Sequence, residues 1–218
     1  MRVLAFDTAL AACSAALFDG DRLLAQQEAA MPRGQAERLM PMIEAVRDAA
    51  GVALADVDLI CVTIGPGTFT GVRIGIAAAR GLALATGAPV LGQTTCEAIA
   101  ANVESFGAES LLVAMDARRE EVYAQAFGPG PTALGPPVLR SRDDIVDVAP
   151  PAGGLIVGSA ARQVLPLLPA ARLADASTLP SAASFGRFAA GRFADARPGA
   201  DLAPLYLRAP DARLPGAD

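Results

Sequence analysis

Residues 3–18 read VLAFDTALAACSAALF, and this stretch decides the fold. Its apolar start ends at Asp7, and apolar residues resume up to Phe18, just before an Asp-Gly step. This order is typical of a β-hairpin that turns into a third strand. Hydrophobic spacing then predicts the remaining elements of the first half: a strand over 22–28, a helix over 34–50, a strand over 59–64, a helix over 71–86 and a strand over 89–91.

The second half of the chain starts the same pattern again. Residues 111–127 read LLVAMDARREEVYAQAF, in which Asp116 and Phe127 stand where Asp7 and Phe18 stand in the first half. The aspartate precedes the phenylalanine by 11 positions in both places (18 − 7 and 127 − 116). The simplest account is a duplicated unit in an α/β protein. Further elements are expected as helices over 97–103, 161–168 and 181–193 and a strand over 155–157, with the last eight or nine residues frayed.

The composition removes several catalytic mechanisms. The chain of 218 residues has no histidine, and all of its 18 basic side chains are arginines. Without imidazole there is no Ser-His-Asp or Cys-His pair and no histidine-bound zinc. Without lysine there is no P-loop lysine and no Schiff base. The sequence therefore favours a protein that binds a partner over one that turns over a substrate, and no cofactor, metal or catalytic residue is expected.

Charge, cysteine usage and hydropathy indicate which partners and which cellular compartment to expect. The net charge of −5 gives no basic face for nucleic acid, so any RNA is expected to be held by something else. Cys13, Cys61 and Cys96 are odd in number and lie among apolar or small residues, which favours reduced core thiols. No apolar run is long enough for a membrane span, and no signal peptide opens the chain. We expect a cytoplasmic protein.

The loop 65–71 is the most distinctive segment of the chain. A strand, a glycine-rich loop and a helix start can form an anion site, because free amides and the helix dipole favour negative charge. However, Val72 stands where a P-loop needs lysine. We favour a tight turn with Thr70 as the helix cap over nucleotide binding.

The helix that follows carries small residues on one side. Gly71, Gly75, Ala78 or Ala79, and Leu82 recur at steps of three or four, so another helix could approach closely there. Arg73 and Arg80 are seven positions apart and project from a common side. Two interpretations stay open at this point: an internal contact with solvated arginines, or an exposed surface for a second protein flanked by arginines that bind carboxylates.

The paired aspartates have a structural and a chemical interpretation. In actin-like ATPases, glycines beside such an aspartate let backbone amides reach phosphates, but here Thr8-Ala9 and residues 117–119 fill those places with side chains. We favour hairpin-capping aspartates over a metal site or an acid-base pair. Glu120 and Glu121 form a charge cluster at the second hairpin tip, expected to be solvated surface, with partner docking as the alternative.

Four segments together resemble a known family. They are VLAFDTALAACSAALFDG, GPGTFTGVRIGIAAARGLA, MDARREEVYAQAF and the late PLYLR, and they look like the bacterial TsaB (YeaZ) family, a subunit in making threonylcarbamoyladenosine in tRNA. The resemblance covers nearly the whole chain. It implies an actin-like (ASKHA) fold of two related lobes, each a strand-strand-strand-helix-strand-helix unit. The expected lobes are residues 1–103, which carry the partner-binding helices, and 104–218.

The resemblance further implies a noncatalytic role beside a larger TsaD-type paralogue that binds metal through histidine and performs the transfer. This chain would pair with that paralogue, form a homodimer when alone, be joined by a TsaE-type P-loop ATPase, and meet tRNA only through the complex. The partner-interface residues implied in the two first-lobe helices are Leu39, Met42, Ile43, Val46, Gly71, Arg73, Ile74, Gly75, Ala78, Ala79 and Leu82.

One position departs from the family pattern, and two alternative functions stay open. Many relatives have a histidine where this chain has Gln35 within PRGQAERLMP, and we expect a helix-entry residue that glutamine can replace. The alternative function is an actin-like ATP-dependent phosphotransferase acting alone, with Asp7 or Asp116 as base. A protease is a weaker alternative, against which the missing histidine argues.

Overall fold

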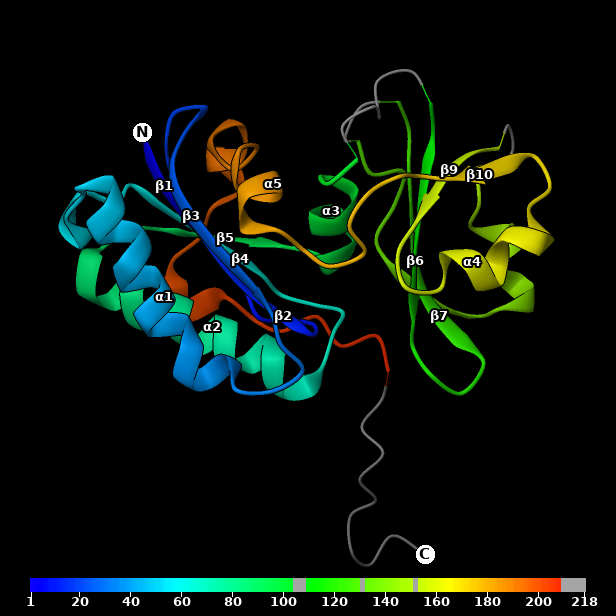
Figure 1. The fold of residues 1–218 in the computed structure, drawn as a ribbon, viewed down its shortest axis with the longest axis horizontal. Coiled ribbons are helices and arrows are strands. Elements are labelled where there is room, and N and C mark those ends of the chain that lie inside the picture. Colours follow the sequence, from blue (N-terminus) through cyan, green and yellow to red (C-terminus); the bar gives the residue numbers. More distant parts are fainter. Residues whose placement is uncertain (104–108, 130–131, 151–152, 209–218) are drawn as a thin grey trace, which may run out of the picture.

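The computed structural model describes residues 1–103, 109–129, 132–150 and 153–208. It holds two five-stranded sheets, seen side by side in Figure 1 with helices packed around each. The frayed end expected over the last residues falls at 209–218, outside the described residues. Among the described residues, no helix combines the length and the hydropathy needed to cross a bilayer.

The first sheet is built around the opening hairpin. Its strands are β1 Arg2–Asp7, β2 Ala12–Asp19, β3 Arg22–Ala30, β4 Leu59–Thr63 and β5 Val90–Gln93, in the spatial order β3-β2-β1-β4-β5. β1 and β2 pair antiparallel with Asp7 opposite Ser14, whereas β1, β4 and β5 run parallel. β1, β2 and β4 are almost fully buried, which explains why they read as continuous apolar runs.

The second sheet repeats this topology. Its strands are β6 Leu111–Asp116, β7 Glu121–Phe127, β8 Val138–Ser141, β9 Gly154–Val157 and β10 Ala171–Leu173, in the order β8-β7-β6-β9-β10. β6 pairs antiparallel with β7 and parallel with β9, as β1 pairs with β2 and β4. The duplication read from the aspartate spacing is therefore confirmed, and the fold is actin-like. The sequence pattern missed β8 and β10, which are short strands at the two edges.

Two long helices cover one face of the first sheet (Figure 1). α1 spans Gln35–Ala50 and ends at Gly51, which adopts the left-handed conformation expected of a C-cap. It continues through Pro41 to Ala50 without ending at the proline. α2 spans Phe69–Thr86. Both helices turn their apolar sides to the sheet in one core with Leu4, Phe6 and Ile60.

The far face of the first sheet is covered by a segment from the end of the chain. α5 Ala182–Gly186 and the 3₁₀ helix Ala190–Asp195 stand where one helix over 181–193 was expected. Phe185 and Ala189 pack against Val3 and Ala5 of β1. The lobe boundary at residues 103 and 104 stays a prediction, but this segment of the predicted second lobe lies on the first sheet.

A short helix, α3 Thr95–Ala100, lies between the two sheets (Figure 1). Cys96 and Ile99 pack into the core of the second sheet, and Ala98 packs against the first. α3 begins at a capping box made by Thr94 and Glu97. In the second lobe, the helix expected over 161–168 is α4 Ala161–Val164 followed by a 3₁₀ turn, Leu165–Leu167. The remaining 3₁₀ segments are Leu54–Asp56, Asp143–Asp147 and Gly199–Asp201.

Cys13, Cys61 and Cys96 are free and buried, as the sequence predicted. Burial raises the pKa of the Cys13 thiol to about 11 and that of Cys61 to about 12, and raises that of Cys96 as well. A thiol that stays protonated is a poor nucleophile, so these side chains act as core packing.

Candidate functional site

The two repeated aspartates hold the same turn in their hairpins. The Asp7 Oδ1 oxygen accepts a hydrogen bond from the Ala9 backbone N–H at 3.1 Å, and Asp116 Oδ1 accepts one from Arg118 N–H at 2.8 Å. Each carboxylate thus binds the amide two residues on, an arrangement that stabilises turns. The hairpin-capping interpretation is confirmed for both residues.

Asp7 differs from Asp116 in its surroundings. Asp7 is fully buried at the end of β1, whereas Asp116 is exposed. The Thr63 hydroxyl donates to Asp7 Oδ1 at 2.5 Å, but Asp7 Oδ2 is buried and has no hydrogen-bond partner among the residues that the structure describes. Desolvation raises the pKa of this carboxyl to about 7, against the lowering effect of the Thr63 hydrogen bond. A carboxyl with no exposed surface cannot act as a base on a substrate in this conformation.

The buried Asp7 predicts a specific pH dependence of stability. Because its folded pKa lies above the unfolded value of 3.8, its contribution is complete below pH 4 and is lost as the pH rises through about 7. We expect the unfolding free energy of the wild type, relative to Asp7→Asn, to fall by about 2–3 kcal/mol between pH 5 and pH 8. Urea unfolding at the two pH values measures this. Asp116→Asn is the matched control, and an equal change in both variants would contradict the account.

The glycine-rich loop forms a tight turn that the first hairpin fills. The cap of α2 is Thr68, whose hydroxyl accepts from Gly71 N–H at 3.1 Å, and not Thr70 as expected. The Thr68 amide donates to the Ala9 carbonyl at 2.8 Å, and the Thr8 hydroxyl donates to the Gly71 carbonyl at 2.7 Å. The turn after β1 therefore packs directly against the start of α2 and takes up helix-end groups that an anion site would need to leave free.

The small residues of α2 face the chain's own sheet. A Cβ atom at Gly71 would lie 2.1 Å from the Thr8 carbonyl oxygen, and one at Gly75 would lie 2.9 Å from the Thr8 hydroxyl and 3.2 Å from Val62 Cγ2. Ala79 and Leu82 complete this buried side with 0% and 6% exposure. Of the two interpretations that the sequence left open, the structure shows the internal contact for this stripe, because the turn after β1 and strand β4 lie against it.

The apolar residues of α1 that were predicted at the interface are also buried within the chain. Leu39, Met42, Ile43 and Val46 are 0–1% exposed and belong to the core of the first sheet. Of the eleven residues predicted at the interface, only Arg73 is exposed, with Ile74 and Ala78 half-buried.

A second stripe on α2 is exposed at Ala77, Gly81 and Ala85 and half-buried at Ile74 and Ala78. Its residues, called the outer face of α2 below, are Ile74, Ala77, Ala78, Gly81 and Ala85. A Cβ atom at Gly81 would meet nothing within 4 Å, so packing within the chain does not require glycine there. Glycine inside a helix costs about 1 kcal/mol relative to alanine. This stripe can also be recognised in the sequence, where it lies one position before the stripe of Gly71, Gly75 and Leu82.

The start of α2 also carries an aromatic and cationic cluster. The rings of Phe69 and Tyr206 stack with centroids 5.7 Å apart, and the Arg73 guanidinium lies 3.6 Å above the Phe69 ring. Arg73 Nε donates to the Tyr206 hydroxyl at 2.8 Å. The segment PLYLR thus binds directly onto the segment GPGTFTGVRIG, although sequence reasoning singled out both without linking them. Leu205 N–H also donates to the Ile64 carbonyl at 2.7 Å.

Two further sequence features have internal partners. The Gln35 side-chain amide donates to the carbonyls of Leu10 and Met31, both at 3.1 Å, and so ties the first hairpin turn to the start of α1, as expected of a helix-entry residue. In the charged hairpin tip, Glu120 pairs with Arg142 at 3.0 Å and Glu121 pairs with Arg208.

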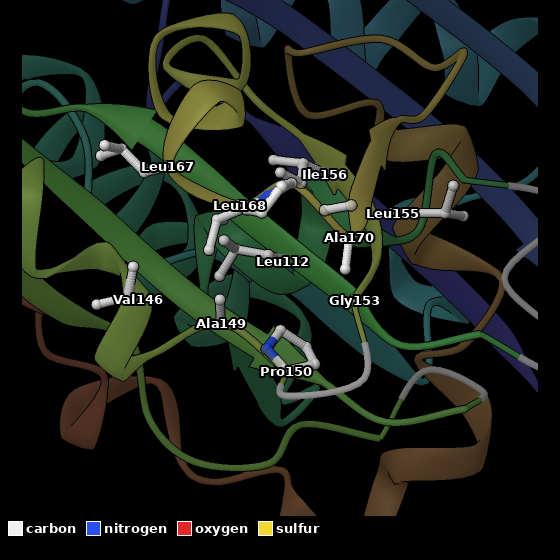
Figure 2. A pocket seen from close by; sticks show the side chains of 12 residues that line it. Leu112, Val146, Ala149, Pro150, Gly153, Leu155, Ile156, Leu167, Leu168 and Ala170 are labelled. Atoms are coloured by element: carbon white, nitrogen blue, oxygen red, sulfur yellow. The ribbon is translucent and has the colours of Figure 1, made fainter.

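The second lobe contains an apolar pocket of about 300 Å³ (Figure 2). It lies beside β6 and β9, and Leu112, Val146, Ile156, Leu167 and Leu168 are among its side chains. None of the lining residues has a titratable or hydroxyl side chain. The pocket therefore offers no group for catalysis. Among the described residues there is also no group of three or more cysteine, aspartate or glutamate side chains that could hold a metal ion.

Known proteins resemble this chain in sequence and in fold. A family model described as TsaD, tRNA N6-adenosine threonylcarbamoyltransferase, matches residues 28–147, more than half of the chain. The solved structure of YeaZ from Pseudomonas aeruginosa superposes with a TM-score of 0.83 at 34% identity, over 94% of this chain and 99% of that one. The chain belongs to the TsaB (YeaZ) family. A tRNA threonylcarbamoyladenosine biosynthesis protein TsaB from Escherichia coli is 42% identical over 124 residues.

The match with this TsaB relative is confined to part of each chain. It covers 56% of this chain and 53% of the E. coli protein, so the chain spans about half the length of the curated TsaB relative. An uncharacterized protein of Mycobacterium tuberculosis (strain H37Rv) is 38% identical over 97% of this chain and 93% of its own length. This protein and the YeaZ structure are thus similar to nearly the whole chain.

Proposed function

We propose that this chain is a noncatalytic subunit of the complex that transfers threonylcarbamoyl to an adenosine of tRNA. It pairs with a TsaD-type catalytic paralogue, and a TsaE-type P-loop ATPase joins the pair. It meets tRNA only through that complex, forms a homodimer when the paralogue is absent, and works in the cytoplasm without a cofactor of its own. The names of the TsaB relatives and the match to the TsaD family model support the pathway.

The filled space at the start of α2 is the observation that carries the noncatalytic role. A Cβ atom placed at Gly71 would lie 2.1 Å from the Thr8 carbonyl oxygen. The Ala9 carbonyl accepts a hydrogen bond from the Thr68 amide. Of the two aspartates that a phosphotransferase could use as base, Asp7 has no exposed surface, and Asp116 is exposed but accepts a hydrogen bond from the Arg118 amide of its own turn. A phosphotransferase acting alone would need this region to open, and nothing in the described residues favours it over a binding role.

The outer face of α2 is the surface that we assign to the paralogue. Small residues at steps of three and four let a partner helix approach closely, and an exposed glycine such as Gly81 is unfavourable unless a partner needs the room. On α1, Met40 adds an apolar side chain that is 39% exposed. The first lobe, residues 1–103, would thus hold the partner-binding helices, with the outer face replacing the buried residues first expected at the interface.

Reconstitution of the reaction tests this function. We expect the labelled threonyl group of a threonylcarbamoyl donor to enter tRNA in a mixture with the TsaD-type paralogue and the ATPase only when this chain is added. Because the chain supplies no reacting group, its own ATP turnover is expected to equal the buffer background. Equal labelling without the chain, or clear ATP turnover by the chain alone, would overturn the proposal.

A further inference from the structure

An open groove runs along the flank of α2 that faces the end of the chain. Residues 196–200 and Pro204 form its far wall. It consists of two hollows of about 540 and 530 Å³, and Arg80 lines both of them. This groove, called the α2 groove below, lies beside the outer face of α2 and shares Ala77 with it.

The α2 groove is positively charged in a protein of net charge −5. Arg73, Arg80 and Arg197 line it, and no aspartate or glutamate does. None of the three arginines forms a salt bridge with any residue that the structure describes. Their charge is therefore available to a ligand.

Two of these arginines are held in position by the chain itself. Arg80 donates to the Leu202 carbonyl at 2.5 Å, and Arg73 donates to Tyr206 while it packs over Phe69. They are seven residues apart on one helix, so their backbones are separated by about 10 Å along the axis. Side chains fixed in this way lose less entropy when they bind carboxylates.

The rest of the α2 groove is apolar. Leu84 stands at its edge with 90% of its surface exposed, and alanines, Pro89 and Pro198 line the floor. A free anion would leave Leu84 uncovered. Single-stranded RNA is also a poor match, since none of the residues that line the groove is aromatic and could stack on a base. An acidic amphipathic segment matches both the arginines and the apolar edge.

We propose that the α2 groove binds an acidic amphipathic segment of a partner protein. Carboxylates of that segment contact Arg73, Arg80 and Arg197, and an apolar side chain covers Leu84. The site shares only Ala77 with the outer face of α2, and its three arginines lie outside that face, so its existence does not depend on the proposed pairing with the paralogue.

A labelled helical peptide tests the groove. The probe carries glutamates seven positions apart and leucines beside them, and a second peptide carries lysines in place of the glutamates. By fluorescence anisotropy at low salt, we expect the acidic peptide to bind at least about 10-fold more tightly than the basic one. Arg197→Glu should weaken acidic-peptide binding about 10-fold and should strengthen basic-peptide binding.

Matched variants separate the possible outcomes. Arg162→Glu changes the charge equally on an exposed helix of the second lobe and should leave peptide binding unchanged. Gly81 does not line the groove, so Gly81→Arg should not weaken acidic-peptide binding, which distinguishes this site from the paralogue interface. Circular dichroism checks that each variant is folded. Equal binding of the two peptides, equal effects of Arg197→Glu and Arg162→Glu, or displacement of the acidic peptide by single-stranded RNA would overturn the proposal.

Discussion

Gly71→Ala is expected to destabilise the isolated chain by at least about 3 kcal/mol, at the upper end of overpacking costs. The added methyl group would lie 2.1 Å from the Thr8 carbonyl oxygen and 2.5 Å from the Thr68 hydroxyl that caps α2. Neither group can move freely, because Thr8 belongs to the buried hairpin turn and Thr68 binds Ala9 through its amide. Urea unfolding followed by circular dichroism measures the change.

The same substitution ten residues later in the helix is expected to have the opposite effect. A methyl group at Gly81 meets nothing within 4 Å, so Gly81→Ala should stabilise the isolated chain by about 0.5–1 kcal/mol through helix propensity. The two alanine variants form a matched pair on one helix. If both destabilise the chain to a similar degree, the assignment of one side to the sheet and the other to solvent is wrong.

Gly81→Arg is expected to weaken pairing with the TsaD-type paralogue by at least about 100-fold, or about 3 kcal/mol. A long charged side chain on the outer face of α2 would hold a partner helix away from the small residues beside it. The isolated variant should keep its fold, since the new side chain points into open space. Isothermal titration calorimetry, with the paralogue titrated into the wild type and into Gly81→Arg, measures this loss of affinity.

Gly191→Arg is the control for this experiment. Gly191 is also exposed with nothing within 4 Å of a Cβ atom, but it lies in the 3₁₀ helix on the other face of the first sheet. Binding by Gly191→Arg should equal that of the wild type. Gly75→Arg would be uninformative, because Gly75 faces Val62 and Thr8 and the variant would lose its fold.

The duplicated sheet could be predicted from the sequence because its signals are local. An apolar strand that ends at an aspartate and a second strand that closes on a phenylalanine at the same distance specify a hairpin, and two copies specify two lobes. The capping role of Asp7 and Asp116 follows from the same pattern. β8 and β10 were missed because they are short edge strands whose register depends on their neighbours.

Which side of α2 packs on the sheet could not be predicted from a local pattern. Small residues follow both Gly71–Gly75–Ala79 and Ile74–Ala78–Gly81, so two stripes compete on one helix, and only contact with Thr8 and Val62 decides between them. The cluster of Phe69, Arg73 and Tyr206 joins residues 133 positions apart. No periodicity within one segment contains that information.

The central claim is that this chain acts by binding a paralogue through the outer face of α2. Analytical ultracentrifugation of the chain mixed with an equimolar amount of the TsaD-type paralogue tests it most directly. The account predicts one species with the summed mass for the wild type and for Gly191→Arg, and two separate species for Gly81→Arg. Separate sedimentation of the wild-type proteins, or a complex that Gly81→Arg leaves intact, would contradict it.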